Sequence, residues 1–234
     1  MTLLIFNPLS LAQDQNGDVK EYDANGKISS DKTYLNGELN GPFEEYYPNG
    51  NIKSVGAYKK GQLQGTYKAY FEDGSESIEK NYANGQLHGP ALERFKDGTP
   101  KSIENYYHDS LNGSCQYYYP NGNLKMTMTF KLGKLNGLSR EFNENGSLKS
   151  EINYVKDHIN GISKEYAADG SLYAVWTYKN DLKDGPAKIY YDDGQLQWEL
   201  SFKAGDLDGP SIKYDQDGKL LLKAIYRKGQ LLSS

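Results

Sequence analysis

Apolar and polar residues alternate along much of this chain, so that every second residue is apolar in several segments. Three segments of this kind are Leu124-Met126-Met128-Phe130, Leu172-Ala174-Trp176-Tyr178 and Leu196-Trp198-Leu200-Phe202. A period of two is typical of β-strands that have one face buried and the other in solvent. No segment has the period of a helix. The pattern therefore predicts an all-β protein.

Glycines divide the chain into units of 24 residues. Three series of positions recur at this period, from Gly17 to Gly209, from Gly26 to Gly218 and from Gly37 to Gly229. The third series has aspartate at Asp109, Asp157 and Asp181. A constant period indicates a tandem repeat. We therefore predict a single repeat domain over residues 13–234, with nine units that fill residues 17–232.

Each unit carries the sequence signals of a β-hairpin. The glycine of the second series always follows Asn or Asp, as in YYPNG over residues 46–50. Asn-Gly and Asp-Gly between strand-like residues are strong hairpin signals. Pro48 suits the first corner of a turn that leaves Gly50 left-handed. The third series also requires a positive φ, which Gly adopts freely and Asp tolerates.

Two columns of aromatic residues follow the repeat. The first lies eight residues after the turn glycine: Tyr34, Tyr58, Tyr82, Tyr106, Phe130, Tyr154, Tyr178, Phe202 and Tyr226. The second lies four residues before it: Tyr22, Tyr46, Tyr70, Arg94, Tyr118, Phe142, Tyr166, Tyr190 and Tyr214. A three-residue loop would pair Tyr46 with Ile52 and place both columns on one inner face, whereas a two-residue loop would separate them. We favour the former, because it gathers the apolar residues. The nine hairpins then form an elongated, single-layer antiparallel sheet, solenoid-like, in which each unit contacts only its neighbours.

Gly56 stands outside the three glycine series. It is expected in the middle of a strand, where an added methyl group improves packing. Gly122 is expected in a turn with positive φ, where a β-branched residue is strained. On the sequence alone, Gly122→Val should therefore cost far more stability than Gly56→Ala.

Composition and charge narrow the classes of partner. Only 37% of the residues are hydrophobic but 21 are Tyr, which suits a thin structure whose buried face is close to water. The formal net charge is −4 and the basic residues are not clustered, which argues against nucleic acid and disfavours anionic membrane lipid as partners. The single cysteine, Cys115, excludes an internal disulfide.

The residues that could carry chemistry form no recognisable active site. His88, His108 and His158 are expected in loops, with no two close in the sheet and none at ligand spacing. Cys115 takes a position that small residues fill in most other units. The glycines never open a helix, so no phosphate-binding loop is indicated. We therefore expect no enzymatic activity, no cofactor and no metal site.

Units such as YKKGQLQG (residues 58–65) and FKLGKLNG (residues 130–137) combine the aromatic, leucine and glycine positions of the repeat. This pattern resembles the MORN repeat (membrane occupation and recognition nexus), specifically its bacterial variant, over residues 17–232. Two departures are Lys183, where leucine is expected, and Arg94, where tyrosine is expected. The resemblance implies a single-layer hairpin solenoid that serves as a scaffold or binding surface. Lipid binding is often proposed for the family, and one bacterial branch is antitoxin-like.

The function that these features favour is a non-catalytic scaffold that binds a protein partner through an aromatic-lined face. Tyr and Arg are enriched at binding hot spots. The candidate binding residues are therefore Tyr46, Tyr70, Arg94 and Lys68, in a groove of the N-terminal half. One alternative is an antitoxin or immunity protein that neutralises a cognate toxin. A cell-wall or glycan-binding module ranks lowest, because such modules are usually rich in Trp and this chain has two.

The two ends of the chain differ from the repeats. The apolar run from Leu3 to Leu11 ends in Ser-Leu-Ala, which predicts the remnant of a secretory signal at residues 1–12 and export of the protein. The alternative is a short tail on a cytoplasmic protein. At the other end, the strand expected at residues 219–226 is apolar on both faces. An uncovered strand of this kind offers backbone groups for pairing, so we expect it to form a homodimer or to be covered by residues 227–234.

Overall fold

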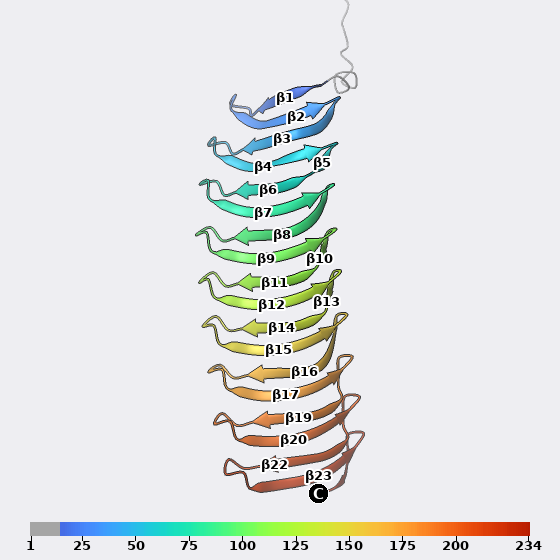
Figure 1. The fold of residues 1–234 in the computed structure, drawn as a ribbon. Helices are drawn as coiled ribbons and strands as arrows, with labels where there is room; N and C mark the ends of the chain where they lie inside the picture. Colours follow the sequence, from blue (N-terminus) through green and yellow to red (C-terminus); the bar gives the residue numbers. More distant parts are fainter. Residues whose placement is uncertain (1–14) are drawn as a thin grey trace, which may run out of the picture. The chain divides into compact units, whose positions relative to one another are not determined.

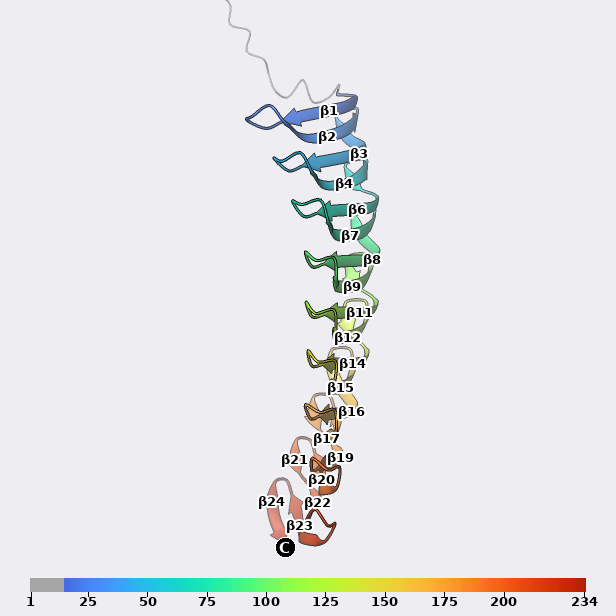
Figure 2. The same cartoon turned by 90° about the vertical axis from the view of Figure 1, so that its left-hand side faces the viewer.

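The computed structural model describes residues 15–234, so the predicted signal at residues 1–12 lies outside the described residues. The chain divides into two compact units, one ending at Ser110 and the other spanning Leu111–Ser234. Within each unit, successive antiparallel hairpins lie side by side (Figure 1). A view turned by 90° shows that each unit is a single layer of strands (Figure 2). The predicted all-β hairpin repeat is confirmed. Over residues 15–234, no helix is long and apolar enough to cross a membrane.

The first unit contains the strands of the first four hairpins. They are β1 (Gly17–Tyr22), β2 (Ile28–Leu35), β3 (Glu38–Tyr46), β4 (Ile52–Lys59), β5 (Gln62–Leu63), β6 (Gly65–Tyr70), β7 (Glu76–Ala83), β8 (Gln86–Arg94) and β9 (Pro100–Tyr107). The short strand β5 continues into β6, and both pair with β4.

The second unit repeats this arrangement. Its strands are β10 (Ser110–Leu111), β11 (Gly113–Tyr118), β12 (Leu124–Lys131), β13 (Lys134–Leu135), β14 (Gly137–Phe142), β15 (Leu148–Val155), β16 (His158–Tyr166), β17 (Leu172–Lys179), β18 (Leu182–Lys183), β19 (Gly185–Tyr190), β20 (Leu196–Lys203), β21 (Asp206–Leu207), β22 (Gly209–Tyr214), β23 (Leu220–Arg227) and β24 (Gln230–Ser233). As in the first unit, a short strand and the longer one after it pair with the same neighbour, for example β13 and β14 with β12.

The turn inside each hairpin is the three-residue loop that the sequence predicts. In the second hairpin, the Tyr47 N–H donates to the Asn51 carbonyl (2.8 Å) and the Gly50 N–H donates to the Tyr47 carbonyl (2.8 Å). Gly50 has a φ of 91°, and Tyr46 pairs with Ile52. Both the loop length and this pairing are confirmed.

The turn between hairpins is a two-residue loop with a positive φ at both positions, as in a type I′ turn. At Leu132 and Gly133 the φ angles are 50° and 78°. The aspartates of the third series, Asp109, Asp157 and Asp181, also have positive φ, as predicted. The left-handed conformation at the first position of this turn was not predicted, because the residues there include Lys60, Leu132 and Ala204 and therefore carry no turn signal.

A β-bulge next to the three-residue loop decides which face each side chain occupies. Tyr46 pairs with Ile52 but Glu45 pairs with Ser54, so Lys53 is an extra residue; the same shift recurs in the other hairpins. Side chains alternate between faces along a strand. Tyr46 therefore lies on the face opposite Tyr58, which pairs with Gly41. The prediction that both aromatic columns share one face is wrong, because the bulge shifts the alternation by one residue.

We name the two faces by their columns. The aromatic face carries the column of Tyr58 and its equivalents, together with the column of Phe43. The charged face carries the column of Tyr46 and its equivalents, together with the ionic residues beside it, such as Lys68 and Glu79.

The buried residues show how a single layer is packed. Apart from Phe43, which is 4% exposed, they are small: Ser30, Ser54, Ala91, Ser102, Cys115, Ser163, Ala174, Ala187, Ser211 and Ala224. On the aromatic face, a large residue is paired with a small one in several hairpins. Phe43 pairs with Gly56, and Ser163 pairs with Trp176. Large side chains are thus half-buried over small neighbours.

This packing contradicts the expectation that Gly56 tolerates alanine. A Cβ atom at Gly56 would lie 2.8 Å from Cε1 of Phe43, closer than van der Waals contact. Gly122 has the expected positive φ (84°), with nothing within 4 Å of a Cβ atom. Both substitutions should therefore destabilise the protein, Gly122→Val through backbone strain and Gly56→Ala through steric overlap.

Side-chain hydrogen bonds connect one hairpin to the next. In six units, the residue just before the glycine of the first series accepts a hydrogen bond from the N–H of the residue 20 positions later, the first residue of a two-residue turn. Asn40 Oδ1 accepts from Lys60 N (3.1 Å) and Gln64 Oε1 accepts from Asn84 N (3.0 Å). Asp184 Oδ2 accepts from Ala204 N in the same way (3.2 Å).

His88 holds this position in the fourth hairpin, and its Nδ1 is buried without a hydrogen-bond partner. We expect His88→Asn to stabilise the protein by about 1 kcal/mol, because the amide oxygen can accept the His108 N–H and no polar atom stays unsatisfied. The measurement is the midpoint of urea unfolding. The reverse change at the equivalent position, Asn40→His, should lower it. An unchanged or lower midpoint in His88→Asn would refute the expectation.

At the C-terminal end, strand β24 pairs with part of β23, joining Ile225 to Ser233 and Tyr226 to Leu231. This is the covering tail expected as one of two alternatives. Leu220, Leu221 and Leu222, at the other end of β23, are 53%, 55% and 38% exposed. A homodimer through this strand stays a prediction.

Candidate binding surface

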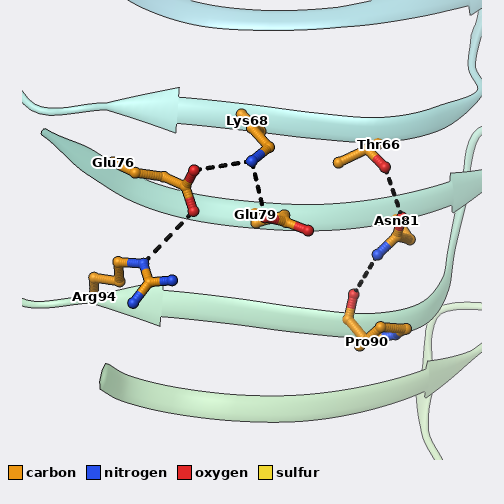
Figure 3. A network of polar contacts seen from close by, with 7 residues as sticks. All are labelled: Thr66, Lys68, Glu76, Glu79, Asn81, Pro90 and Arg94. Carbon is orange, nitrogen blue, oxygen red and sulfur yellow. Dashed lines mark hydrogen bonds and ion pairs between the residues drawn. The ribbon is translucent and has the colours of Figure 1, made fainter. Parts of the chain in front are cut away.

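Two of the four predicted binding residues, Lys68 and Arg94, form one ionic cluster on the charged face (Figure 3). The Lys68 ammonium lies 2.9 Å from the Glu76 carboxylate and 3.1 Å from that of Glu79. Arg94 Nε lies 3.5 Å from the other oxygen of Glu76. Glu76 on β7 thus bridges a cation on β6 and a cation on β8.

The cluster holds its groups in their charged forms. The hydrogen bond to Glu76 raises the pKa of Lys68 above its usual range. The hydrogen bond from Lys68, with the nearby charge of Arg94, lowers the pKa of Glu76. A partner that binds Lys68 or Arg94 must therefore compete with a carboxylate already in place.

The two predicted tyrosines lie in the same column of the charged face. The Tyr46 hydroxyl donates to the Glu44 carboxylate, which raises the pKa of Tyr46 to about 12. Tyr70 pairs with Glu76 and so lies beside the cluster. Tyr70 and Arg94 also border a hollow of about 300 Å3. Residues of the aromatic face, including Tyr67 and Ile78, line the same hollow.

Elsewhere on the charged face, charges are again paired with one another. Arg140 Nε lies 2.8 Å from Glu151, whose other oxygen lies 3.5 Å from Lys164. The Tyr166 hydroxyl donates to the same carboxylate (3.0 Å). Neutral contacts continue the pattern, since Asn81 links Thr66 to the Pro90 carbonyl (Figure 3). These polar groups of the charged face therefore form hydrogen bonds and ion pairs between strands of the sheet.

The aromatic face of the first unit carries a continuous row of rings. Phe43 packs 5.0 Å from Tyr58 and 6.3 Å from Tyr67, whose ring lies 6.3 Å from Tyr82, edge to face. Burial raises the pKa of Tyr58 and of Tyr82. Phe43 and Tyr67 were not identified from the sequence as part of this row of rings. The equivalent position is Ala, Ser or Cys in most other units, so no column of aromatic residues is visible there.

The aromatic face of the second unit places lysines over aromatic rings. The Lys183 ammonium lies 3.2 Å from the centroid of a Trp176 ring and 5.4 Å from that of Phe202. Burial lowers the pKa of Lys183. Lys213 lies 5.3 Å from the Trp198 ring centroid. In the sequence, Lys183 stood out only as a departure from the leucine column; its position over Trp176 explains why a cation is accommodated there.

Two histidines that were expected to lie apart are in contact. The ring centroids of His88 and His108 are 5.1 Å apart, and Tyr107 packs on both. The expectation was wrong because these residues are 20 positions apart, the spacing that joins one hairpin to the next. His158, the first residue of β16, lies 2.6 Å from Asp181 in the next turn. His88 also lies in a strand, β8, so the expectation that these two residues are in loops was wrong. Across residues 15–234, no group of three or more His, Cys, Asp or Glu side chains could hold a metal ion.

Comparison with known proteins gives one clear match. The model of the MORN repeat variant matches residues 15–36, 39–60, 111–132, 135–156, 159–180, 183–204 and 207–228. The model of the MORN repeat itself matches residues 81–99. No curated protein sequence matches the chain.

Solved structures with some likeness belong to much larger chains. The crystal structure of TcdB2-TccC3-TEV is 13% identical with a TM-score of 0.23, and the match covers 92% of this chain and 14% of that one. A Tc holotoxin pore from Photorhabdus luminescens has the same identity and coverage with a TM-score of 0.22. This chain thus spans about a seventh of their length. At such scores the likeness supports no conclusion about function.

Proposed function

This chain belongs to the MORN-repeat family, and we propose from this premise that it is a non-catalytic scaffold that binds a protein partner through its aromatic face. Members of this family generally mediate binding to proteins or membranes. The aromatic face replaces the groove around Tyr46 and Lys68 as the main candidate surface.

The observation that carries the proposal is the row of half-buried rings on the aromatic face, a face that also carries ion pairs such as those of Lys32 with Glu21 and Glu45. On the charged face, ionic groups are engaged with one another, as in the cluster of Lys68, Glu76 and Arg94. On the aromatic face, half-buried rings form a row on a single-layer sheet, without a second layer over the described strands (Figure 2). Uncovered aromatic side chains among polar residues are typical of protein interaction sites.

Two further features favour a protein over the other partner classes. Sugar rings bind by stacking on open aromatic faces, but Lys183 and Lys213 already lie over Trp176 and Trp198. Anionic lipid and nucleic acid require clustered basic residues. The cations nearest the predicted groove, Lys68 and Arg94, are instead paired with Glu76.

The test compares matched truncations on the two faces. The double variant Tyr58→Ser/Tyr82→Ser removes two rings of the row on the aromatic face, and Tyr46→Ser/Tyr70→Ser removes two half-buried rings from the charged face. We expect the first to weaken binding of a partner captured by the wild type at least about tenfold, since aromatic anchors dominate interface energies. The second should have little effect.

The affinity of each purified variant for that partner is measured by titration calorimetry, with circular dichroism as the check on folding. A loss of affinity confined to the Tyr46→Ser/Tyr70→Ser variant would overturn the proposal and return the binding site to the charged face.

A further inference from the structure

A hollow of about 240 Å3 lies on the aromatic face of the second unit. It is formed between the hairpin of β19 and β20 and the hairpin of β22 and β23. Its lining residues are Ile189, Trp198, Leu200, Leu207, Ser211 and Tyr226. All but Ser211 are apolar or aromatic.

The hollow coincides with a break in the pairing of large with small residues. At the equivalent position of earlier hairpins, at least one partner is larger, as in Phe43 with Gly56, Ser163 with Trp176 and Ala187 with Leu200. In the last hairpin Ser211 pairs with Ala224, so both partners are small. The volume that a large side chain fills elsewhere is therefore empty of protein atoms here.

Ser211 supplies a second observation that points to a ligand. The residue is 2% exposed, and its hydroxyl has no hydrogen-bond partner among the described residues. Buried polar atoms almost always have a partner. A hydroxyl of this kind at the wall of an apolar hollow can be satisfied by a polar atom at the end of an otherwise apolar group.

A cation lies beside the hollow. Lys213 pairs with Trp198 across β20 and β22, and its ammonium lies 5.3 Å from the Trp198 ring centroid. A group that enters next to Trp198 therefore meets apolar walls, one hydroxyl and one positive charge.

We propose that this hollow is a socket for one tyrosine side chain of the protein partner, with a carboxylate next to that tyrosine in its sequence. The ring fits the apolar walls, the phenol oxygen bonds to the Ser211 hydroxyl, and the carboxylate pairs with Lys213. Tyrosine is also one of the residues that most often anchor an interface. This inference rests on the proposed function and adds the chemistry of the segment that binds.

The probe is the peptide acetyl-Glu-Tyr-Glu-amide, titrated into the 15N-labelled full chain. The chain has two tryptophans, and the indole N–H resonance of Trp198 is identified by its loss in Trp198→Phe. We expect this resonance to shift while that of Trp176 does not. Acetyl-Lys-Tyr-Lys-amide should bind more weakly because of Lys213. Acetyl-Glu-Phe-Glu-amide should bind about three- to tenfold more weakly, the effect of one neutral hydrogen bond.

Two variants separate the socket from the surface around it. Ser211→Phe fills the hollow as Phe43 does opposite Gly56, and should abolish the shift. Ser211→Val, the residue type found at Val19 in the same column, is the smaller filling variant should the first fail to fold. Ser211→Ala keeps the hollow but should remove the preference for tyrosine over phenylalanine.

An unmoved Trp198 resonance in the wild type, or an equal shift in the filled variants, would overturn the socket. Equal binding of the Glu and Lys peptides would overturn the role of Lys213. Failure of the proposed function is a separate result, since it appears as partner binding that survives the Tyr58→Ser/Tyr82→Ser change, far from this hollow in sequence.

Discussion

Replacing Gly41 with alanine is expected to destabilise the first unit by about 2–4 kcal/mol, from backbone strain and steric overlap together. Gly41 has a φ of 144°, a conformation that residues with a side chain rarely adopt. An added Cβ atom would also lie 2.6 Å from Cβ of Thr33 on the neighbouring strand. That atom is fixed to the backbone, so relief requires the strands to move apart.

The matched control is Gly65→Ala at the equivalent position of the next hairpin. Gly65 also has a positive φ (79°), but nothing lies within 4 Å of an added Cβ atom. It should therefore show the strain alone, about 1–2 kcal/mol. Urea unfolding measures both, and Thr33→Gly should recover part of the loss in the Gly41→Ala background only. Equal losses at the two glycines would show that the contact with Thr33 is unimportant.

Gly56→Ala is expected to cost about 1–3 kcal/mol, as overpacking of a filled site usually does. The new methyl group would meet the ring of Phe43, which is 4% exposed and therefore has little room to move. This result is the opposite of the expectation from the sequence, which was that alanine in place of a glycine in the middle of a strand improves packing.

A double-mutant cycle isolates the cause. Phe43→Ala removes the ring, so Gly56→Ala in that background should be neutral or stabilising, because the added methyl group then meets no ring. The measured quantity is the coupling between the two changes in urea unfolding. A Gly56→Ala effect that is the same with and without Phe43 would exclude the ring as its origin.

The sequence alone determined the repeat, the loop inside each hairpin, the positive-φ position of the third glycine series and the strand class. Glycine and Asn-Gly at a fixed period report local backbone conformation, and Gly50 and the left-handed Asp109 have the positive φ that such residues predict. Tyr46 pairs with Ile52 as expected, because loop length is also a local property.

Only the tertiary structure decided which side chains share a face. The extra residue Lys53 makes a bulge that no residue type announces, and it puts Tyr46 and Tyr58 on opposite faces. Contacts between residues on different strands, such as Phe43 with Gly56 or Lys183 with Trp176, could likewise not be predicted from the sequence. The physical reason is that strand alternation has a period of two. A single unrecognised insertion therefore exchanges the faces, whereas each local turn signal is unaffected by it.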